Sequence, residues 1–391
     1  MHSKYYTVFI ILLFLVTPFG AAFAADVTLT PSLSLRGEYN DNIDFSRTNK
    51  QDDYIGTVSP GLTFGYATDR LNFGARAVVD VVRYMDQTNQ DNERQNYGLD
   101  ASYRMFERLS IRANGFYVKD TTLDTELQET GIVELRSERE HYGGGGGLSF
   151  QISEVADMGL DYSYTKTDYD LVDYTDSDGH SVSLPFNYSF NNRLDVLTLR
   201  PYYRNTDSDE DKIDSYGFSL GLAHTFTETF TASVTPGVRY TETETKPSGR
   251  SDDEWGWTAD VSLDKSWQTA SASLGYSRDL DYTAEGETVE VNRFSLSGSK
   301  MLTSRFSVRL LGSLYFTKST GTSQNEDRRY YEVTPSLNYM ITENHSLALG
   351  YSYSNEHDKM LTDDQDRDRN MAWLTLNFNF PQKWLFFVNN G

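Results

Sequence analysis

The most informative feature of this chain is an alternation of apolar and polar residues with a period of two. Every second side chain of a β-strand points to the same face, so the alternation predicts strands that are apolar on one face and polar on the other. In the run LSIRANGFYV (109–118), Leu109 and Ile111 share one face, whereas Arg112 and Asn114 lie on the other. The same pattern predicts eighteen strands, at residues 27–39, 54–67, 70–84, 93–105, 108–119, 138–151, 155–167, 178–190, 194–206, 213–226, 229–241, 253–266, 268–279, 289–301, 304–317, 328–341, 344–355 and 370–380.

The connections between these predicted strands alternate in length. Short turns such as FER (106–108) and TEN (342–344) follow the even-numbered strands, whereas long polar segments such as NDNIDFSRTNKQDD (40–53) and EHDKMLTDDQDRD (356–368) follow the odd-numbered ones. An even number of strands with short turns at one end and long loops at the other is typical of outer-membrane barrels. The first and last strands must also pair, because an open sheet edge in lipid leaves backbone groups without hydrogen bonds. The sequence therefore predicts an all-β fold, a transmembrane up-and-down antiparallel β-barrel of about eighteen strands over residues 25–380.

Both ends of the mature chain are expected on the periplasmic side of the outer membrane of a Gram-negative cell. Residues 1–24 combine a basic start, a short apolar core and the small-residue site AFA (22–24), which predicts a secretory signal peptide. Alternation begins at Val27, so we expect no N-terminal plug of the kind that TonB-dependent transporters carry. Residues 381–391 follow the last predicted strand and are expected to form a C-terminal periplasmic tail.

Composition narrows the choice of partners and chemistry. The chain has 35 Lys and Arg against 57 Asp and Glu, and loss of residues 1–24 removes one Lys, which leaves 34 against 57 and a net charge of −23. Such an acidic protein is a poor partner for nucleic acid. Cysteine is absent, which excludes disulfides, thiolate metal sites and cysteine nucleophiles. The histidines are scattered without the spacing of a catalytic triad or a metal site, so we expect no enzyme, no metal and no cofactor.

Motifs in the first two predicted strands and their loop carry a family resemblance. They are EYNDN (38–42), DDYI (52–55) and SPGL (59–62). This segment resembles the opening of outer-membrane β-barrels found with exopolysaccharide and exosortase systems, often labelled β-barrel porin-like proteins. The resemblance implies a conduit or accessory pore in exopolysaccharide export, working with polysaccharide and envelope export components, and it implies no catalytic residues. The rest of the chain matches only as a succession of aromatic-rich barrel strands.

In each predicted strand, the polar positions of the alternation face the inside of the barrel, and many of these positions carry charged residues. Charged residues on the inward face can select solutes by the sign of their charge, or they can pair with one another to stabilise the barrel interior, and the sequence leaves both interpretations open. The predicted pore-lining residues are Arg36, Arg76, Asp80, Arg112, Arg200, Arg204, Arg239, Asp260, Asp264 and Arg309, with Glu332 on the same face.

Further inward features are expected. A barrel of this strand number leaves an aqueous channel unless loops fold inward. The long segment TTLDTELQETGIVEL (121–135) is either such an inward-folded constriction or a solvated external loop. By phase, Phe116, Tyr202, Tyr315 and Trp373 are candidates for inward sugar-stacking platforms, although interfacial girdles explain most aromatic residues near strand ends.

Expected partners outside the lumen are outer-membrane lipid, lipopolysaccharide and the barrel assembly machinery. The last predicted strand ends in the aromatic Phe380, the kind of end that the assembly machinery recognises. The acidic loops are either solvated or linked to lipopolysaccharide phosphates through divalent cations.

Two features conflict with regular strands. Five glycines, 143–147, stand inside the sixth predicted strand, where the phosphate-loop pattern fails because no Gly-Lys-Ser/Thr follows. Glycine in a strand marks a bend or a close approach by another group, and we expect a bend or a thinned wall with free lumen beside it. Six prolines stand inside predicted strands, where each removes one backbone N–H donor from the hydrogen-bond ladder. Our hypothesis is that β-bulges near the membrane rims accommodate them. The six prolines are Pro31, Pro60, Pro185, Pro201, Pro236 and Pro335.

Three functions are compatible with these observations. The family resemblance favours an exopolysaccharide-export pore. The polar inward face alone equally suits a general diffusion porin for small solutes. A structural or adhesin barrel, with its loops as the active part, is the third.

Overall fold

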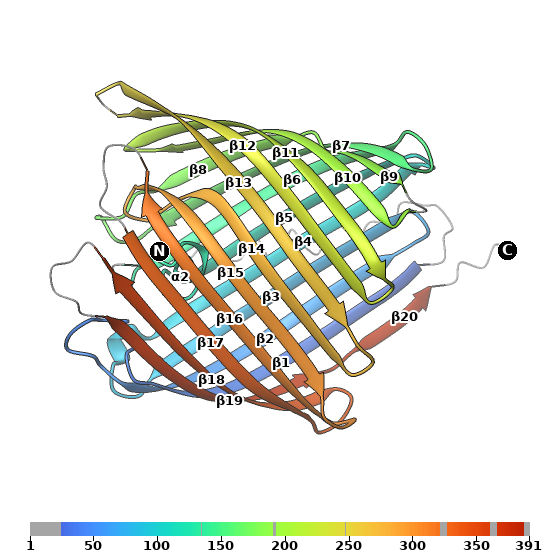
Figure 1. Cartoon of the computed structure of the whole chain (residues 1–391). Coiled ribbons are helices and arrows are strands. Elements are labelled where there is room, and N and C mark those ends of the chain that lie inside the picture. Colours follow the sequence, from blue (N-terminus) through green and yellow to red (C-terminus); the bar gives the residue numbers. More distant parts are fainter. Residues whose placement is uncertain are drawn as a thin grey trace, which may run out of the picture.

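A computed structural model describes residues 25–133, 135–190, 193–246, 248–320, 327–359 and 366–386. The predicted signal peptide, residues 1–24, lies outside these described residues. Within them the chain forms one sheet and two short helices, η1 (Thr88–Gln90) and α2 (Glu126–Glu129) (Figure 1). The strands are β1 (Ala25–Asn40), β2 (Asp53–Ala67), β3 (Leu71–Tyr84), β4 (Asn92–Phe106), β5 (Leu109–Thr121), β6 (Glu138–Gln151), β7 (Ala156–Tyr169), β8 (Ser177–Ser183), β9 (Phe186–Phe190), β10 (Asp195–Ser208), β11 (Asp211–Thr227), β12 (Phe230–Thr245), β13 (Arg250–Ser266), β14 (Ala270–Tyr282), β15 (Thr288–Met301), β16 (Phe306–Ser319), β17 (Asp327–Met340), β18 (His345–Asp358), β19 (Arg367–Asn379) and β20 (Gln382–Phe386). None of the described helices is long and apolar enough to cross a membrane.

The sheet closes into a barrel because β1 has partners on both edges. It pairs antiparallel with β2 on one edge and with β19 and β20 on the other. β8 and β9 share the neighbours β7 and β10 in one register, so together they form a single barrel strand with a break at residues 184–185. β19 and β20 likewise form one strand against β1. The barrel therefore has eighteen strands, which confirms the fold predicted from the sequence.

The two ends of the barrel differ, as the loop lengths predict. The short turns gather at the end drawn on the right of Figure 1, which we call the short-turn end, and α2 lies near the opposite, long-loop end. β1 begins at the short-turn end, where Ala25 pairs with Phe386 of β20. Residues 382–386, expected from the sequence in a tail, instead continue the barrel because β1 extends far enough to offer them a hydrogen-bonding edge.

The six in-strand prolines lie at breaks in the hydrogen-bond ladder, and the hypothesis that they form bulges is wrong. Beside Pro60, for example, β2 and β3 pair at Val58↔Val81 and resume at Gly61↔Val78 in the same register. Pairing also skips two residues beside Pro31, Pro185, Pro201, Pro236 and Pro335 without a shift. Each proline lacks an N–H donor, so a local loss of pairing suffices to accommodate it. The register shifts that do occur lie elsewhere, at Arg104/Phe106 and Thr225/Thr227.

The outer face of the barrel is apolar and carries bands of aromatic rings. Exposed side chains such as Leu62, Leu220 and Leu310 alternate with inward-facing polar ones along their strands. Aromatic pairs such as Tyr240 and Trp255, with ring centroids 5.1 Å apart, lie on this outer face. This arrangement is that of interfacial aromatic girdles around a membrane-facing wall.

Candidate functional site

The inner face of the barrel is polar and charged. Paired residues of neighbouring strands share a face, so the exposed apolar side chains fix which residues point outward and which point into the lumen. By this criterion the structure places all the predicted lining residues on the inner face: Arg36, Arg76, Asp80, Arg112, Arg200, Arg204, Arg239, Asp260, Asp264, Arg309 and Glu332.

Four of the predicted arginines are paired with acids. Arg112 Nη2 lies 2.9 Å from Asp161 Oδ1, and Arg36 forms an ion pair with Glu38. Arg204 and Arg239 share Asp279, at 3.2 and 3.4 Å. Their first role is therefore to balance charge within the wall.

The remaining three predicted arginines have no ion-pair partner among the residues that the structure describes. They are Arg76, Arg200 and Arg309. Each lies on the inner face in the short-turn half of its strand. Of the predicted lining arginines, these three have the charge most available to a passing ion.

The inward aromatic residues lie against the wall. Phe116, Tyr202 and Trp373 each lie over a glycine of a neighbouring strand, namely Gly143, Gly217 and Gly350. The Arg36 guanidinium also lies over the Trp373 ring, 4.4 Å from its centroid. These rings therefore leave the centre of the lumen free, because the glycines give them room to lie flat. Tyr315 differs from them, since it is 3% exposed and covered by a segment inside the lumen.

That segment, residues 122–137, connects β5 to β6 and folds into the barrel; we call it the inward segment, and Glu134 within it lies outside the described residues. Its base is closed by a hydrogen bond from Thr122 N to Ser137 O, 3.0 Å. Of the two interpretations open for this sequence, the structure therefore supports an inward fold. A buried apolar cluster holds it: Leu123, Leu127, Ile132 and Val133 with Phe45, Val289, Val291, Tyr315 and Tyr330.

Hydrogen bonds fasten the inward segment to the opposite wall. The Arg293 guanidinium and the Tyr315 hydroxyl both donate to Gln128 O, the latter at 2.5 Å. Thr317 Oγ1 donates to Thr130 O at 2.5 Å. β15 and β16, which carry these donors, lie halfway around the ring of eighteen strands from β5 and β6. The segment therefore crosses the lumen and narrows it.

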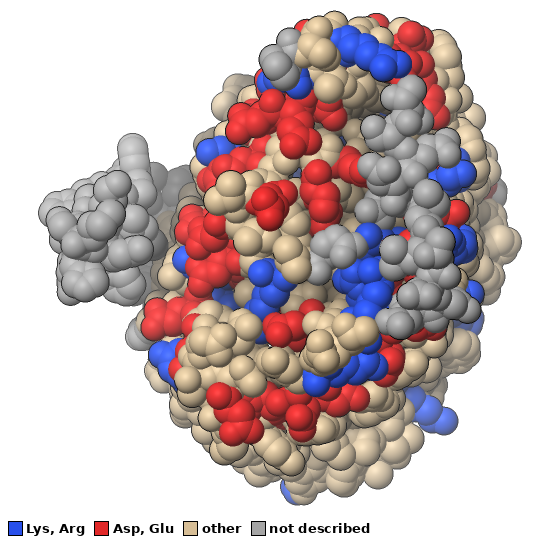
Figure 2. Space-filling model, turned by 90° about the vertical axis from the view of Figure 1, so that its left-hand side faces the viewer, with Lys and Arg blue, Asp and Glu red and all other residues tan. Residues whose placement is uncertain are grey.

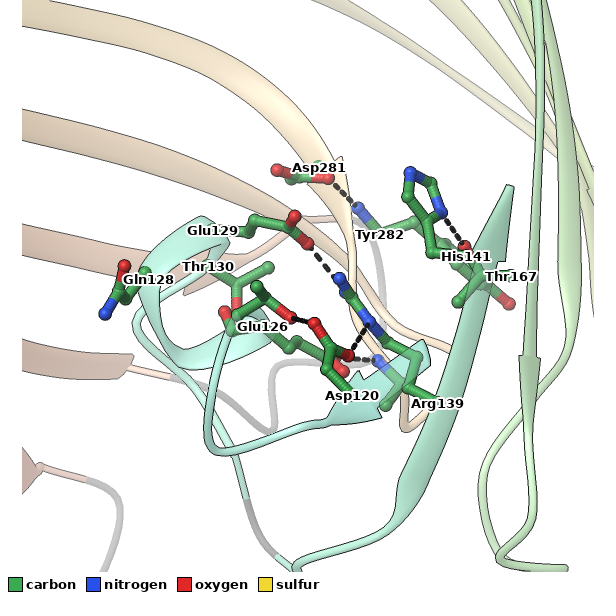
Figure 3. A network of polar contacts seen from close by, with 12 residues as sticks. Asp120, Glu126, Gln128, Glu129, Thr130, Arg139, His141, Thr167, Asp281 and Tyr282 are labelled. Atoms are coloured by element: carbon green, nitrogen blue, oxygen red, sulfur yellow. Dashed lines mark hydrogen bonds and ion pairs between the residues drawn. The ribbon is translucent and has the colours of Figure 1, made fainter. Parts of the chain in front are cut away.

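On its own side of the lumen the inward segment is held by a charged network around Arg139 of β6 (Figure 3). The Arg139 guanidinium lies 2.9 Å from Glu129 and 3.3 Å from Asp120. Nearby, the Glu126 carboxylate accepts hydrogen bonds from Ala284 N at 2.7 Å and from the Tyr169 hydroxyl at 3.1 Å. Burial raises the pKa of Glu126 to about 8, and the charge of Glu285 adds to this shift.

A second charged cluster, which the sequence did not single out, lies at the long-loop end. Glu356 is fully buried, and Arg47, Arg328 and Arg367 lie 3.3, 3.6 and 3.4 Å from it. Figure 2 shows acidic side chains over much of this end of the barrel, with basic side chains both near its middle and at its rim. Arg328 and Arg367 come from β17 and β19, the two neighbours of the β18 strand that carries Glu356, and closure of the barrel brings Arg47 of the β1–β2 loop to them.

The glycine run of β6 is a place where side chains of β5 come close to the backbone. β6 pairs in unbroken register with both β5 and β7, so the wall is continuous and the strand pairing is not bent out of line. Gly143, Gly145 and Gly147 face the lumen. A Cβ at these three positions would collide respectively with Tyr164 O, with Tyr162 O and with the Asp161 carboxylate. The expected bend, or thinned wall with free lumen beside it, is therefore not observed, because Phe116, Asn114 and Arg112 lie over the three glycines in turn.

A cavity with several polar lining residues lies beside this glycine run. It has a volume of about 460 Å³ and is lined by Arg112, Asp161, Asn114 and Asp100, together with four serines, Ser102, Ser163, Ser181 and Ser183. Arg112 is the fourth residue of β5, so the cavity belongs to the short-turn half of the lumen. In the described part of the chain, no group of three or more acidic or histidine side chains could hold a metal ion.

Comparison with known proteins agrees with this architecture. The sequence profile of a family described as "Putative beta-barrel porin 2" matches residues 23–184, which is less than half of the chain. None of the curated protein sequences compared with this chain matches it.

Among solved structures, the chain is similar in fold to outer-membrane proteins, one of them described as a porin. OccK1 (OpdK) of Pseudomonas aeruginosa has a TM-score of 0.50 at 11% identity, over 90% of this chain and 99% of that one. OccAB2 of Acinetobacter baumannii has a TM-score of 0.49 at 13% identity, over 92% and 99% of the two chains. A BenF-like porin of Pseudomonas fluorescens has a TM-score of 0.49 at 11% identity, over 91% and 99%. At these identities the likeness concerns the fold. The chain is a porin-like barrel of the outer-membrane type, and no association with exopolysaccharide is shown.

Proposed function

We propose that this protein is an outer-membrane porin through which small polar solutes diffuse. The observation that carries the proposal is the inward segment, which is fastened to the opposite wall through Gln128 O and Thr130 O. An aqueous barrel that is narrowed in this way admits small solutes and excludes large ones. The charged inner face supplies the polar surroundings that such solutes need.

The topology proposed for the membrane follows from the two different ends of the barrel. The short-turn end and both termini face the periplasm, and the long, acidic loops face the outside, as in other outer-membrane barrels. The outer aromatic bands contact lipid and lipopolysaccharide. A diffusion pore of this kind needs no catalytic group and no cofactor.

Export of exopolysaccharide is the less well supported alternative. The resemblance that suggested it involves only the first two strands and their loop. A segment that crosses the lumen, with Leu127 1% exposed and Ile132 fully buried, leaves less room for a polymer than an open barrel. We therefore expect surface polysaccharide to be unchanged in a strain that lacks this protein.

A solute-swelling assay tests the proposed function. Purified protein in liposomes should permit swelling in monosaccharides and small amino acids, with rates that fall steeply for tri- and tetrasaccharides. Empty liposomes are the control. Absence of swelling with every solute, together with polymer retained in the periplasm of the deletion strain, would overturn the proposal in favour of export.

A further inference from the structure

We infer that the cavity beside the glycine run is a binding subsite for a neutral, hydroxyl-rich solute of monosaccharide size. The inference deepens the proposed function, on which it rests, by naming a class of solute. The volume of about 460 Å³ lies within the range of about 300–1,000 Å³ that is usual for small-molecule sites.

The cavity exists because small residues meet around it. Gly147 places no side chain over the floor, and the serines of β4, β7 and β8 project only a hydroxyl from the adjacent wall. Arg112 and Asp161 close one side of the cavity, since their ion pair passes over Gly147. A bulkier residue in place of Gly147 or of any of the four serines would fill the space. Small residues of four strands, β4, β6, β7 and β8, therefore form the cavity together.

The lining offers donors and acceptors side by side. The Arg112 side chain is 57% exposed and that of Asp161 39% exposed, so both remain accessible while they are paired. A guanidinium only donates hydrogen bonds, an ionised carboxylate only accepts them, and amide and hydroxyl groups do both. Two adjacent hydroxyls of a sugar match this pattern, because one can accept from Arg112 while the other donates to Asp161.

The charge of the cavity argues against an anion as its ligand. Its lining contains one basic residue, Arg112, and two acidic residues, Asp100 and Asp161. The single cation is already within 2.9 Å of a carboxylate, which an incoming anion would have to displace. Neutral groups, Asn114 and the four serines, make up most of the polar lining, so a neutral solute with several hydroxyls is the best match.

An aromatic ring extends the same surface. Phe116 follows Asn114 on the inner face of β5 and lies over Gly143, as Asn114 lies over Gly145. Residues two apart on a strand are about 7 Å from one another, so the ring is next to the cavity. Its flat apolar face can contact the C–H groups of a sugar ring.

Saturation-transfer NMR with glucose as the probe tests binding on the full chain in detergent micelles, without requiring transport. The wild type should transfer saturation to glucose, with half-saturation at millimolar concentration. Asn114→Ala and Asp161→Asn should each raise that concentration about fivefold, the effect of losing one hydrogen bond. Asn338→Ala, an inner-face asparagine of β17, is the matched control and should bind glucose as the wild type does.

Three results would overturn the inference. One is absence of glucose binding by a wild-type protein that conducts ions in bilayers, in which case the porin function stands without the subsite. The second is glucose binding that neither Asn114→Ala nor Asp161→Asn weakens. The third is a stronger response to acetate or ethylammonium than to glucose. Glucose binding by a protein that fails to conduct would support the subsite and contradict the proposed function instead.

Discussion

Arg112 on β5 is joined to Asp161 on β7 across an intervening strand, with 2.9 Å between Nη2 and Oδ1. Gly147 of β6 lies beneath this ion pair, and a methyl group there would collide with the Asp161 carboxylate. Side chains of one strand can therefore lie over the backbone of the next, which explains why β6 carries glycine at each of its three central inward positions.

Replacing Gly143 with alanine should destabilise the barrel. A Cβ at this position would collide with the backbone oxygen of Tyr164, which cannot move without disturbing the β6–β7 ladder. We expect a loss of about 1–3 kcal/mol in the free energy of unfolding, the usual cost of overpacking. Unfolding by urea in micelles measures it.

Gly146→Ala is the control, because its Cβ would point outward and meet only Arg112 O at 3.6 Å. That variant should be as stable as the wild type or slightly more so. Equal stability losses at 143 and 146 would contradict the close-approach explanation.

Neutralising Arg309 should move the ion selectivity of the pore toward cations. Arg309 lies on the inner face without an ion-pair partner in the described part of the chain. Loss of one charge about 8 Å from an ion in water changes its energy enough to alter the cation-to-anion permeability ratio about twofold. Reversal potentials of Arg309→Gln in a salt gradient test this, with Arg305→Gln, in the adjoining short turn, as the comparison. An unchanged reversal potential for Arg309→Gln would exclude it from the ion path.

Conductance should rise with pH through the titration of Glu126. When the inward segment is docked, that is, bonded to the opposite wall, the pKa of this carboxyl is raised to about 8 from its ordinary value of 4.5. The docked segment therefore retains a proton that a segment released from the wall would lose. Docking is therefore strongest below pH 4.5, weakens as the pH rises, and changes no further above about pH 8. Single-channel recordings from pH 5 to 9 should show that the pore opens more frequently as the pH rises.

The variant Glu126→Gln removes the titrating proton and should make the gating independent of pH over the same range. If the pH dependence is the same in Glu126→Gln and the wild type, another group is responsible for it.

Removing one fastening hydrogen bond should loosen the inward segment. Tyr315→Phe deletes the bond to Gln128 O and should weaken docking by about 0.5–1.5 kcal/mol. In single-channel recordings, fluctuations of the current that arise from release of the inward segment should be more frequent in Tyr315→Phe than in the wild type. Tyr339→Phe, on the outer face of β17, is the matched control, and fluctuations that increase equally in both variants would point to a general loss of stability.

The sequence was sufficient to predict the barrel because each strand repeats the same two-residue alternation. The inward position of Arg309 or Asp260 follows from that alternation alone. The fold of residues 121–135 could not be decided in the same way, since its apolar residues needed a partner that lies far along the chain. A signal was present nevertheless: Val289 and Val291 are apolar at inward positions, which a water-filled barrel does not require.

Other features depend on closure of the barrel. Glu356 meets Arg367 across the β18–β19 pairing, but it meets Arg47 only because β1 returns to β19, so no local pattern could have indicated the whole cluster. The extension of the barrel by β20 likewise depends on the length of the free edge of β1.

The proposed function requires that the inward segment narrows a conducting pore. Because Thr122 N already bonds to Ser137 O, residues 123–136 can be replaced by Asn-Gly, a pair that closes a two-residue hairpin. Single-channel conductance of this variant, compared with the wild type in planar bilayers at neutral pH, is the most direct test. We predict a conducting wild type and a severalfold larger conductance in the variant. Equal conductances, or a wild type that does not conduct, would contradict a narrowing of the pore by this segment.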